Sequence, residues 1–420
     1  MRILVISNLY PPHFLGGYEI LCHQVNQVFQ ARGHEVVALT SDFRNMSIPD
    51  GDTGVHEGIP VHRDLETYLP FNAPASPAKL VRMRVARANQ HTAGRLIRAV
   101  QPDIIFVWSQ LRVTVGAALA AEASGIPVVY TMNDDHLAGY GFGHFGLRPA
   151  TLAHCIADRL LFRGITYGAL RLENVTCISE CVKKDLVDQN IPIQDARVIY
   201  QGIPIERFPL ATAADRYPAG IENALENRPL RILYVGQLHP YKGVHTLVEA
   251  AVRVAERRGR RALEVTIVGG GAEEYVGELR RAASRGCAAV AFAGKQPHHR
   301  MAALYRDHDV FVFPSIWREP FGLTHLEAMA SGTPVVSTAD GGHGEFLVDG
   351  ENALVFTKDD AGSLAAALEK ILDDPGLALR LAGAARTMVE TRFTLDRYVS
   401  DLESYLQELV NRCVTELVTP

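Results

Sequence analysis

Residues 310–337 have the sequence VFVFPSIWREPFGLTHLEAMASGTPVVS, and this stretch decides the fold class. Its first four residues, 310–313, form an apolar β-rich run that predicts a buried strand, and residues 335–337 predict a second one. The residues between them predict a helix that begins near Gly322. A strand, a helix and a strand in this order are typical of a parallel β-sheet covered by helices.

The same alternation of short apolar runs and helical stretches extends over the chain. In the first half, a helix is predicted at 19–32 and strands are predicted at 3–7, 35–39, 104–108, 128–131, 175–178 and 198–200. In the second half, strands are predicted at 231–235, 265–268, 290–293, 310–313, 335–337 and 353–355. The predicted fold class is therefore α/β, with two doubly wound, Rossmann-like domains that face a cleft.

A polar stretch at 206–228, broken by prolines and glycines, predicts a linker between the two halves. We therefore expect an N-terminal domain at 1–205 and a C-terminal domain at 229–394. Residues 395–420 contain an amphipathic run that predicts a helix, which we expect to pack back on the N-terminal domain.

Composition excludes several classes of protein. The chain has 420 residues, 47% of them hydrophobic, with 42 Lys and Arg against 47 Asp and Glu, so fibrous and disordered classes are excluded. A net charge of −5 gives no sign of nucleic-acid binding. The six cysteines lack the spacing of a disulfide scaffold or a zinc site. With no signal peptide or membrane span apparent, we expect a cytoplasmic protein.

Ligands of open α/β sheets bind at the carboxyl ends of the strands, and unusual residues follow two of the predicted strands. Gly16 and Gly17 lie after the first strand, where a helix N-terminus offers free N–H groups to a ligand. A tight turn is the alternative interpretation of this loop.

The second loop, after the strand at 310–313, carries two carboxylates. Glu319 precedes the helix and Glu327 lies about two turns into it, while Gly322, Leu323 and Thr324 expose backbone N–H groups at its amino end. Carboxylates that accept sugar hydroxyls, beside N–H groups that bind phosphate, suit a sugar nucleotide.

This whole stretch resembles the signature of the retaining glycosyltransferases of family four, also called group 1, which have the two-domain GT-B fold. The signature is two glutamates separated by seven residues, with Phe-Gly-Leu between them and Glu-Ala-Met-Ala after. The resemblance extends over essentially the whole chain and includes 16–17, 32–36, 178–179, 202–203, 341–342 and Glu345.

The resemblance implies roles for these residues. Glu319 contacts the donor hexose and stabilises positive charge at its anomeric carbon, and Glu327 holds the ribose. The N–H groups of Leu323 and Thr324 contact the diphosphate or the sugar. Lys242 matches a family cation that neutralises the leaving diphosphate, whereas the second cation, usually Arg, is replaced by uncharged Gln237.

Family members often carry His-Asp after the strand that corresponds to 128–131, and the histidine contacts the donor sugar. Here Asn133 takes that place, and His136 follows shortly after, so either residue is a candidate for the role. This fold class normally neutralises the diphosphate with side chains and helix dipoles, so we expect no metal site and no cofactor beyond the donor.

The function predicted from these observations is retaining, metal-independent transfer of a hexose from a UDP- or GDP-sugar to a small-molecule, glycan or lipid-linked acceptor. Two alternatives stay open: a sugar-nucleotide epimerase of the same architecture, and a weakly catalytic sugar-nucleotide binding protein. An acid-free basic stretch at 79–98 has two interpretations. It is a solvated or phosphate-facing helix, or, as in some family members, it makes peripheral contact with anionic lipid at the inner membrane face.

Overall fold

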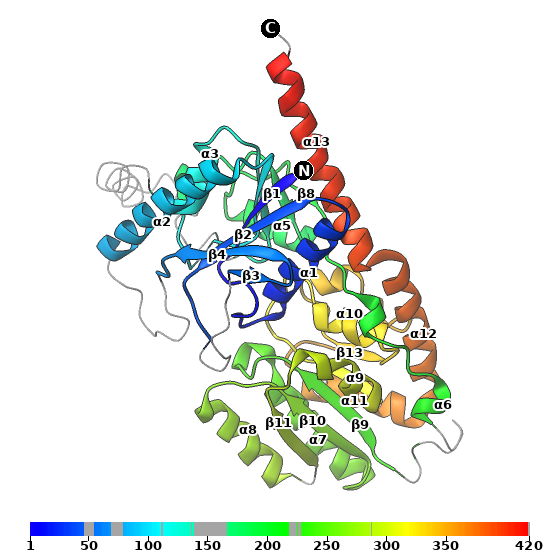
Figure 1. Cartoon of the computed structure of the whole chain (residues 1–420). Helices are drawn as coiled ribbons and strands as arrows, with labels where there is room; N and C mark the ends of the chain where they lie inside the picture. The colour runs from blue at the N-terminus through cyan, green and yellow to red at the C-terminus, as the bar shows by residue number, and fades with distance from the viewer. Residues whose placement is uncertain are drawn as a thin grey trace. The chain divides into compact units, whose positions relative to one another are not determined.

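A computed structural model of the chain describes residues 1–45, 54–68, 79–110, 112–135, 137, 165, 167–217, 225, 228–286 and 288–418. The chain forms two compact units, shown in Figure 1: Met1–Tyr200 with Tyr398–Pro420, and Gln201–Arg397. Within the described residues, no helix has a stretch long and apolar enough to cross a membrane.

The first unit is built on an eight-stranded sheet in the order β3-β4-β2-β1-β5-β6-β7-β8. The strands pair in parallel except for the antiparallel hairpin of β3 and β4. The strands are β1 (Arg2–Ile6), β2 (Glu35–Ser41), β3 (Val55–His56), β4 (Ile59–Leu65), β5 (Ile104–Val107), β6 (Val128–Met132), β7 (Val175–Cys177) and β8 (Arg197–Val198). Its main helices are α1 (Gly17–Ala31), α2 (Lys79–Val100), α3 (Gly116–Glu122), α5 (Glu180–Asp188) and α13 (Leu395–Val418).

The second unit has a six-stranded parallel sheet in the order β11-β10-β9-β12-β13-β14. Its strands are β9 (Leu230–Val235), β10 (Leu263–Val268), β11 (Ala289–Gly294), β12 (Val310–Phe313), β13 (Val335–Ser337) and β14 (Leu354–Val355). Its helices are α6 (Ala213–Arg216), α7 (Val244–Arg258), α8 (Glu273–Arg285), α9 (Met301–Asp307), α10 (Leu323–Ala330), α11 (Ala361–Asp373) and α12 (Pro375–Arg392), with short 3-10 turns between them.

Strand order locates the place where a ligand is expected in each sheet. In the second unit, β10 and β11 follow β9 toward one edge of the sheet, whereas β13 and β14 follow β12 toward the other edge. The strand order therefore reverses between β9 and β12. In the first unit the same reversal falls between β1 and β5. Loops that leave adjacent strands at such a point diverge and open a crevice at the carboxyl ends.

The prediction of an α/β fold with two parallel-sheet domains is confirmed, and most strand ends agree within two residues. The hairpin of β3 and β4 was not predicted, because Pro60 and the adjacent charged residues Arg63 and Asp64 interrupt the apolar pattern of β4. The C-terminal helix, expected within 395–420, spans Leu395–Val418. Its Glu403 accepts bonds from Arg32 and His34, both at 2.6 Å, within the first unit.

The expected linker at 206–228 differs from what is observed in its described part. Residues 206–217 belong to the second unit, where the side chain of Arg216 is almost fully buried. Its guanidinium donates to the Ser331 carbonyl and to the Thr333 hydroxyl. A segment with a polar sequence can thus pack firmly when one long side chain finds buried hydrogen-bond acceptors.

Candidate active site

The reversal point of the second sheet brings together a cation and a carboxylate. Lys242 lies in the loop after β9, and Glu319 lies in the loop after β12. The Lys242 ammonium donates to Glu319 Oε1 at 2.6 Å, and the Ser315 hydroxyl donates to the same oxygen at 2.6 Å. Both partners are largely buried, with side chains 12% and 8% exposed, so this ion pair is protected from solvent screening.

Aromatic rings surround the Lys242 ammonium. The ring centroids of Trp317, Tyr241 and Phe313 lie 4.8, 5.3 and 5.7 Å from Nζ. Cation–π attraction of this kind is worth about 0.5–2 kcal/mol, depending on desolvation. The cation is therefore held by Glu319 on one side and by rings on others.

Close backbone packing fixes the two loops against each other. Gly243 has φ +65°, and a Cβ atom there would lie 1.9 Å from the Pro314 carbonyl oxygen. On the other side of Glu319, the N–H of Gly342 donates to the Glu319 carbonyl at 2.7 Å. Glycine at 243 thus lets the β9 loop touch the β12 loop, which positions Lys242 opposite Glu319.

Helix α10 begins at Leu323, four residues after Glu319. Gly322 caps its amino end with φ +117°, and Leu323 and Thr324 form its first turn. The first N–H groups of an α-helix have no acceptor within the helix and carry partial positive charge. The residues expected to bind phosphate therefore present a helix N-terminus at the same strand end as Lys242.

Glu327, one of the two predicted carboxylates, has its own partners. The Tyr305 hydroxyl donates to Glu327 Oε2 at 3.0 Å, and His298 Nε2 lies 3.3 Å from Oε1. The hydrogen bond to Glu327 raises the pKa of the His298 imidazole above its usual value. Glu327 is thus oriented by a phenol on one side and an imidazole on the other.

Gln237 occupies the place where the family usually has Arg. Its side-chain oxygen accepts from the Tyr241 hydroxyl at 3.1 Å, and its carbonyl accepts from the Tyr234 hydroxyl at 2.8 Å. These bonds order the side chain without adding charge. The β9 loop accordingly carries Lys242 as its cation and a neutral amide at 237.

In the first unit, the predicted loop lies at the carboxyl end of β1. Gly16 caps α1, and its N–H donates to the Glu19 carboxylate at 2.8 Å. Glu19 is 3% exposed, and burial raises its pKa to about 7. The loop at Gly16 and Gly17 is therefore organised by a buried acid that titrates near neutral pH.

Asn133 and His136 are the two candidates for the place of the family histidine, and the structure describes the first of them. Asn133 follows β6, and its amide donates to the Trp108 carbonyl after β5 at 3.0 Å. This bond ties together the carboxyl ends of neighbouring strands next to the reversal point. His136 lies outside the described residues.

Three partners of the predicted residues were not anticipated: Ser315, Tyr305 and His298. Ser315 is a polar residue close behind a buried strand, which is a signal that could have identified it. Tyr305 and His298 come from the α9 segment and reach Glu327 only through the fold. No local sequence pattern marks them.

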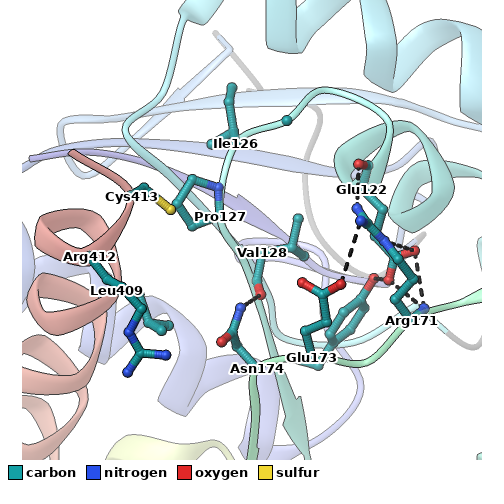
Figure 2. A pocket seen from close by; sticks show the side chains of 12 residues that line it. Glu122, Ile126, Pro127, Val128, Arg171, Glu173, Asn174, Leu409, Arg412 and Cys413 are labelled. Carbon is teal, nitrogen blue, oxygen red and sulfur yellow. Dashed lines mark hydrogen bonds and ion pairs between the residues drawn. The ribbon is translucent and has the colours of Figure 1, made fainter. Parts of the chain in front are cut away.

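A hollow of about 400 Å³ lies elsewhere on the first unit, as Figure 2 shows. It is lined by Val128 at the start of β6 and by Asn174 before β7, and Arg171 pairs with Glu122 and Glu173 at its rim. This is the amino end of the strands, opposite the end where the loops of Gly16 and Asn133 lie. Ligands of open α/β sheets bind at the carboxyl ends, so the hollow is not the candidate active site.

Comparison with known proteins agrees with this geometry. Residues 221–388 match the family described as "Glycosyl transferases group 1", and residues 15–207 match "Glycosyltransferase Family 4". The chain therefore belongs to the group 1 glycosyltransferases and is a glycosyltransferase of GT-B fold.

Particular relatives can be named. Glycogen synthase of Mycobacterium tuberculosis is 30% identical over 404 residues, covering 94% of this chain and 91% of the relative. D-inositol 3-phosphate glycosyltransferase of Salinispora arenicola is 29% identical over 354 residues, covering 81% and 74%. Among solved structures, sucrose-phosphate synthase of Thermosynechococcus elongatus has a TM-score of 0.71 at 21% identity, covering 98% of this chain and 99% of that one. Anabaena HepE, solved in complex with UDP-glucose, has a TM-score of 0.68 at 22% identity, covering 97% and 100%.

Proposed function

We propose that this glycosyltransferase transfers a hexose from a UDP- or GDP-sugar to an acceptor with retention of anomeric configuration. The observation that carries the proposal is the buried Lys242–Glu319 pair beside the N-terminus of α10. A cation, a carboxylate and a helix N-terminus at one strand end match the charges of a nucleotide diphosphate sugar. Two observations on similar proteins support this substrate class: HepE was solved in complex with UDP-glucose, and glycogen synthase and D-inositol 3-phosphate glycosyltransferase are relatives of the chain.

The Lys242–Glu319 ion pair indicates how both side chains change partners when the donor binds. In the structure, Glu319 accepts a hydrogen bond from the Lys242 ammonium at 2.6 Å. When a diphosphate enters, Lys242 can turn to the phosphate oxygens, and Glu319, still held by Ser315, is free to accept a sugar hydroxyl. Charge that grows on the leaving phosphate is then stabilised by Lys242 and by the N–H groups of Leu323 and Thr324.

Glu319 has a second task in a retaining reaction. As the bond between the anomeric carbon and the diphosphate oxygen breaks, positive charge grows on the anomeric carbon, and the carboxylate of Glu319 stabilises it. The leaving phosphate takes the proton of the acceptor hydroxyl, and that hydroxyl forms the new bond on the same face. No separate base is needed in this front-face route, and Glu327 holds the ribose of the donor.

We also propose that the reaction needs no metal ion. Lys242 and the amino end of α10 supply the positive charge that a divalent cation supplies in other phosphate sites. Turnover in the presence of excess EDTA should equal turnover with Mg²⁺ or Mn²⁺. Activity that disappears with EDTA and returns with either cation would contradict this part of the proposal.

The decisive experiment is a donor panel followed by an acceptor screen. We expect one UDP- or GDP-hexose to raise the melting temperature more than the others, and NMR of the product to show the donor's anomeric configuration. An inverted product would overturn retention. An epimerised nucleotide sugar formed without acceptor would favour the epimerase alternative, which nothing among these relatives supports. Binding without turnover across the panel would favour the weakly catalytic binding protein.

For the acceptor side, we propose a cytoplasmic enzyme in peripheral contact with anionic lipid. Among the described residues, Cys22, Cys177 and Cys413 form no disulfide bond, as is usual in a reducing compartment. On α2, exposed cationic or titratable side chains recur at helical spacing on one face: Arg84, Arg87, His91, Arg95 and Arg98. A stripe of this kind attracts anionic headgroups.

The lipid contact can be tested with vesicles. The chain should sediment with vesicles of phosphatidylglycerol and phosphatidylcholine but not with phosphatidylcholine alone. The double variant Arg87→Gln, Arg95→Gln should lose most of this binding, while Arg280→Gln, Arg285→Gln on α8 should keep it. Equal binding by both double variants would contradict the assignment to α2.

A further inference from the structure

A group of three side chains in the first unit has the composition of a metal site. His23 lies on α1, and His56 and Glu57 lie on the hairpin of β3 and β4. One ligand atom from each, two imidazole nitrogens and a carboxylate oxygen, all lie within 4.8 Å of one another. The proposed glycosyl transfer uses none of these residues.

The individual contacts are close to those that ligation requires. His23 Nε2 lies 3.0 Å from Glu57 Oε2, a separation that two ligands of one tetrahedral or octahedral ion also show. The rings of His23 and His56 have centroids 4.7 Å apart and are tilted by 48°. The His56 side chain is only half-buried, and its ligand nitrogen lies within 4.8 Å of the ligand atoms of His23 and Glu57.

The residues that are hydrogen-bonded to His23 and Glu57 also fit a metal site. His23 Nδ1 lies 3.1 Å from the Tyr10 hydroxyl, which in turn accepts from the Asn26 amide at 3.0 Å. With its proton on Nδ1 and donated to Tyr10, the imidazole leaves the Nε2 lone pair for a metal ion. Such a second partner on the far ring nitrogen is the usual feature of ligating histidines. Gln27 donates to the Glu57 carboxylate and orients it from α1.

The backbone at Glu57 adds an independent observation. His56 pairs with Ile59, so Glu57 and Gly58 form a two-residue hairpin loop with φ of +49° and +84°. This loop prefers Asn, Asp or Gly at its first position, because other residues are strained by about 1–2 kcal/mol there. A long carboxylate side chain at this position turns back to α1 instead of facing solvent alone.

We propose that His23, His56 and Glu57 bind a divalent transition-metal ion of the zinc type. Two imidazoles and one carboxylate are a donor set that Zn²⁺ accepts, with a water in the remaining position because Glu57 is more than half exposed. The ion joins the hairpin to α1 and, through Tyr10, to the loop that ends at Gly16. Its role is structural, and it leaves the chemistry at Glu319 unchanged.

The test uses the untagged full chain after removal of metals by chelator. Titration calorimetry with Zn²⁺ should show about one equivalent bound, and Co²⁺ should give visible d–d absorption. His56→Ala and Glu57→Gln should each weaken Zn²⁺ binding at least tenfold. Both residues lie on the hairpin surface, so the variants should stay folded, as circular dichroism will verify.

A matched control lies on the neighbouring strand. His62 on β4 faces Asp64 at 3.6 Å and is also partly exposed, but no third ligand joins them among the described residues. His62→Ala should therefore bind Zn²⁺ as the unchanged chain does. If the chain binds no Zn²⁺, or if His56→Ala and Glu57→Gln bind it as tightly as His62→Ala, the proposal is wrong and the contacts are ordinary hydrogen bonds.

Discussion

Each unit places a buried glutamate at the reversal point of its sheet, and the two glutamates are held differently. Glu319 in the second unit is 6% exposed and contacts a lysine ammonium and a serine hydroxyl. Glu19 in the first unit is 3% exposed and is hydrogen-bonded to the N–H of Gly16. The same residue type, buried to the same degree, thus has a charged partner in one unit and a backbone partner in the other.

We interpret this difference as a difference in role: Glu319 belongs to a site that binds charged groups, whereas Glu19 supports a loop. The cation next to Glu319 offsets the free-energy cost of burying the carboxylate. Glu19 lacks an ionic hydrogen bond of this kind among its described contacts, and burial raises its pKa to about 7. We infer that the second unit carries the reacting charges, while the first unit shapes the loop at Gly16 and Gly17.

Among the variants that test this contrast, Glu319→Gln should have the largest effect. The amide keeps the size and can still accept from Ser315, but it cannot stabilise positive charge, so kcat should fall by about 10²–10³-fold. Steady-state kinetics with the best donor and acceptor measure the effect. Glu351→Gln, in an exposed turn of the same unit, is the control and should keep full activity. Unchanged kcat in Glu319→Gln would remove the proposed role.

Rigidity of the second unit's loops is tested by Gly243→Ala. The new methyl group would overlap the Pro314 carbonyl, so the free energy of unfolding should fall by about 3 kcal/mol. Gly350→Ala, in the same unit, has a similar positive φ of +75°, with no atom near the added Cβ. It should cost only about 1 kcal/mol. Equal losses in urea unfolding of the two variants would show that contact with Pro314 is unimportant.

The first unit's glutamate predicts a pH dependence of stability. Between pH 4.5 and 7 the folded state holds the Glu19 proton and the unfolded state does not, so stability falls as pH rises. The loss should reach roughly 2–3 kcal/mol by pH 7, and Glu19→Gln should abolish it.

Trp108 reports on the first unit, because it lies at the end of β5 and the chain's second tryptophan is Trp317. Urea unfolding followed by fluorescence in a Trp317→Phe background therefore isolates the effect. Stability that is flat between pH 5 and 7 in the parent, or that falls equally in Glu19→Gln, would contradict the assignment.

The smallest expected effect concerns Gln237, where the second unit lacks a family cation. Gln237→Arg should place a second positive charge near Lys242 and raise kcat/KM for the donor by up to about tenfold. Gln237→Leu removes the amide without adding charge and should not increase activity. A lower kcat/KM in Gln237→Arg would indicate that the neutral amide itself suits this enzyme's donor.

Much of the second unit's site was predictable from local sequence. Glu319, Gly322 and Glu327 lie in one continuous stretch of sequence. Their relative positions in the fold follow from that spacing, because one short loop and one helix connect them. The partners of these residues were not predictable. His298 reaches Glu327 from a 3-10 turn and Tyr305 reaches it from α9, while Arg216 packs the expected linker onto the second unit.

The sequence by itself determined the alternation of strands and helices, the group 1 signature and the replacement of a cation by Gln237, because each depends on residues close together in the chain. Only the tertiary structure decided which side chains meet. Lys242 reaches Glu319 across 77 positions. His23 reaches Glu57 across 34 positions. Such pairs depend on strand order and on glycine contacts such as that of Gly243 with Pro314, and sequence periodicity does not encode either one.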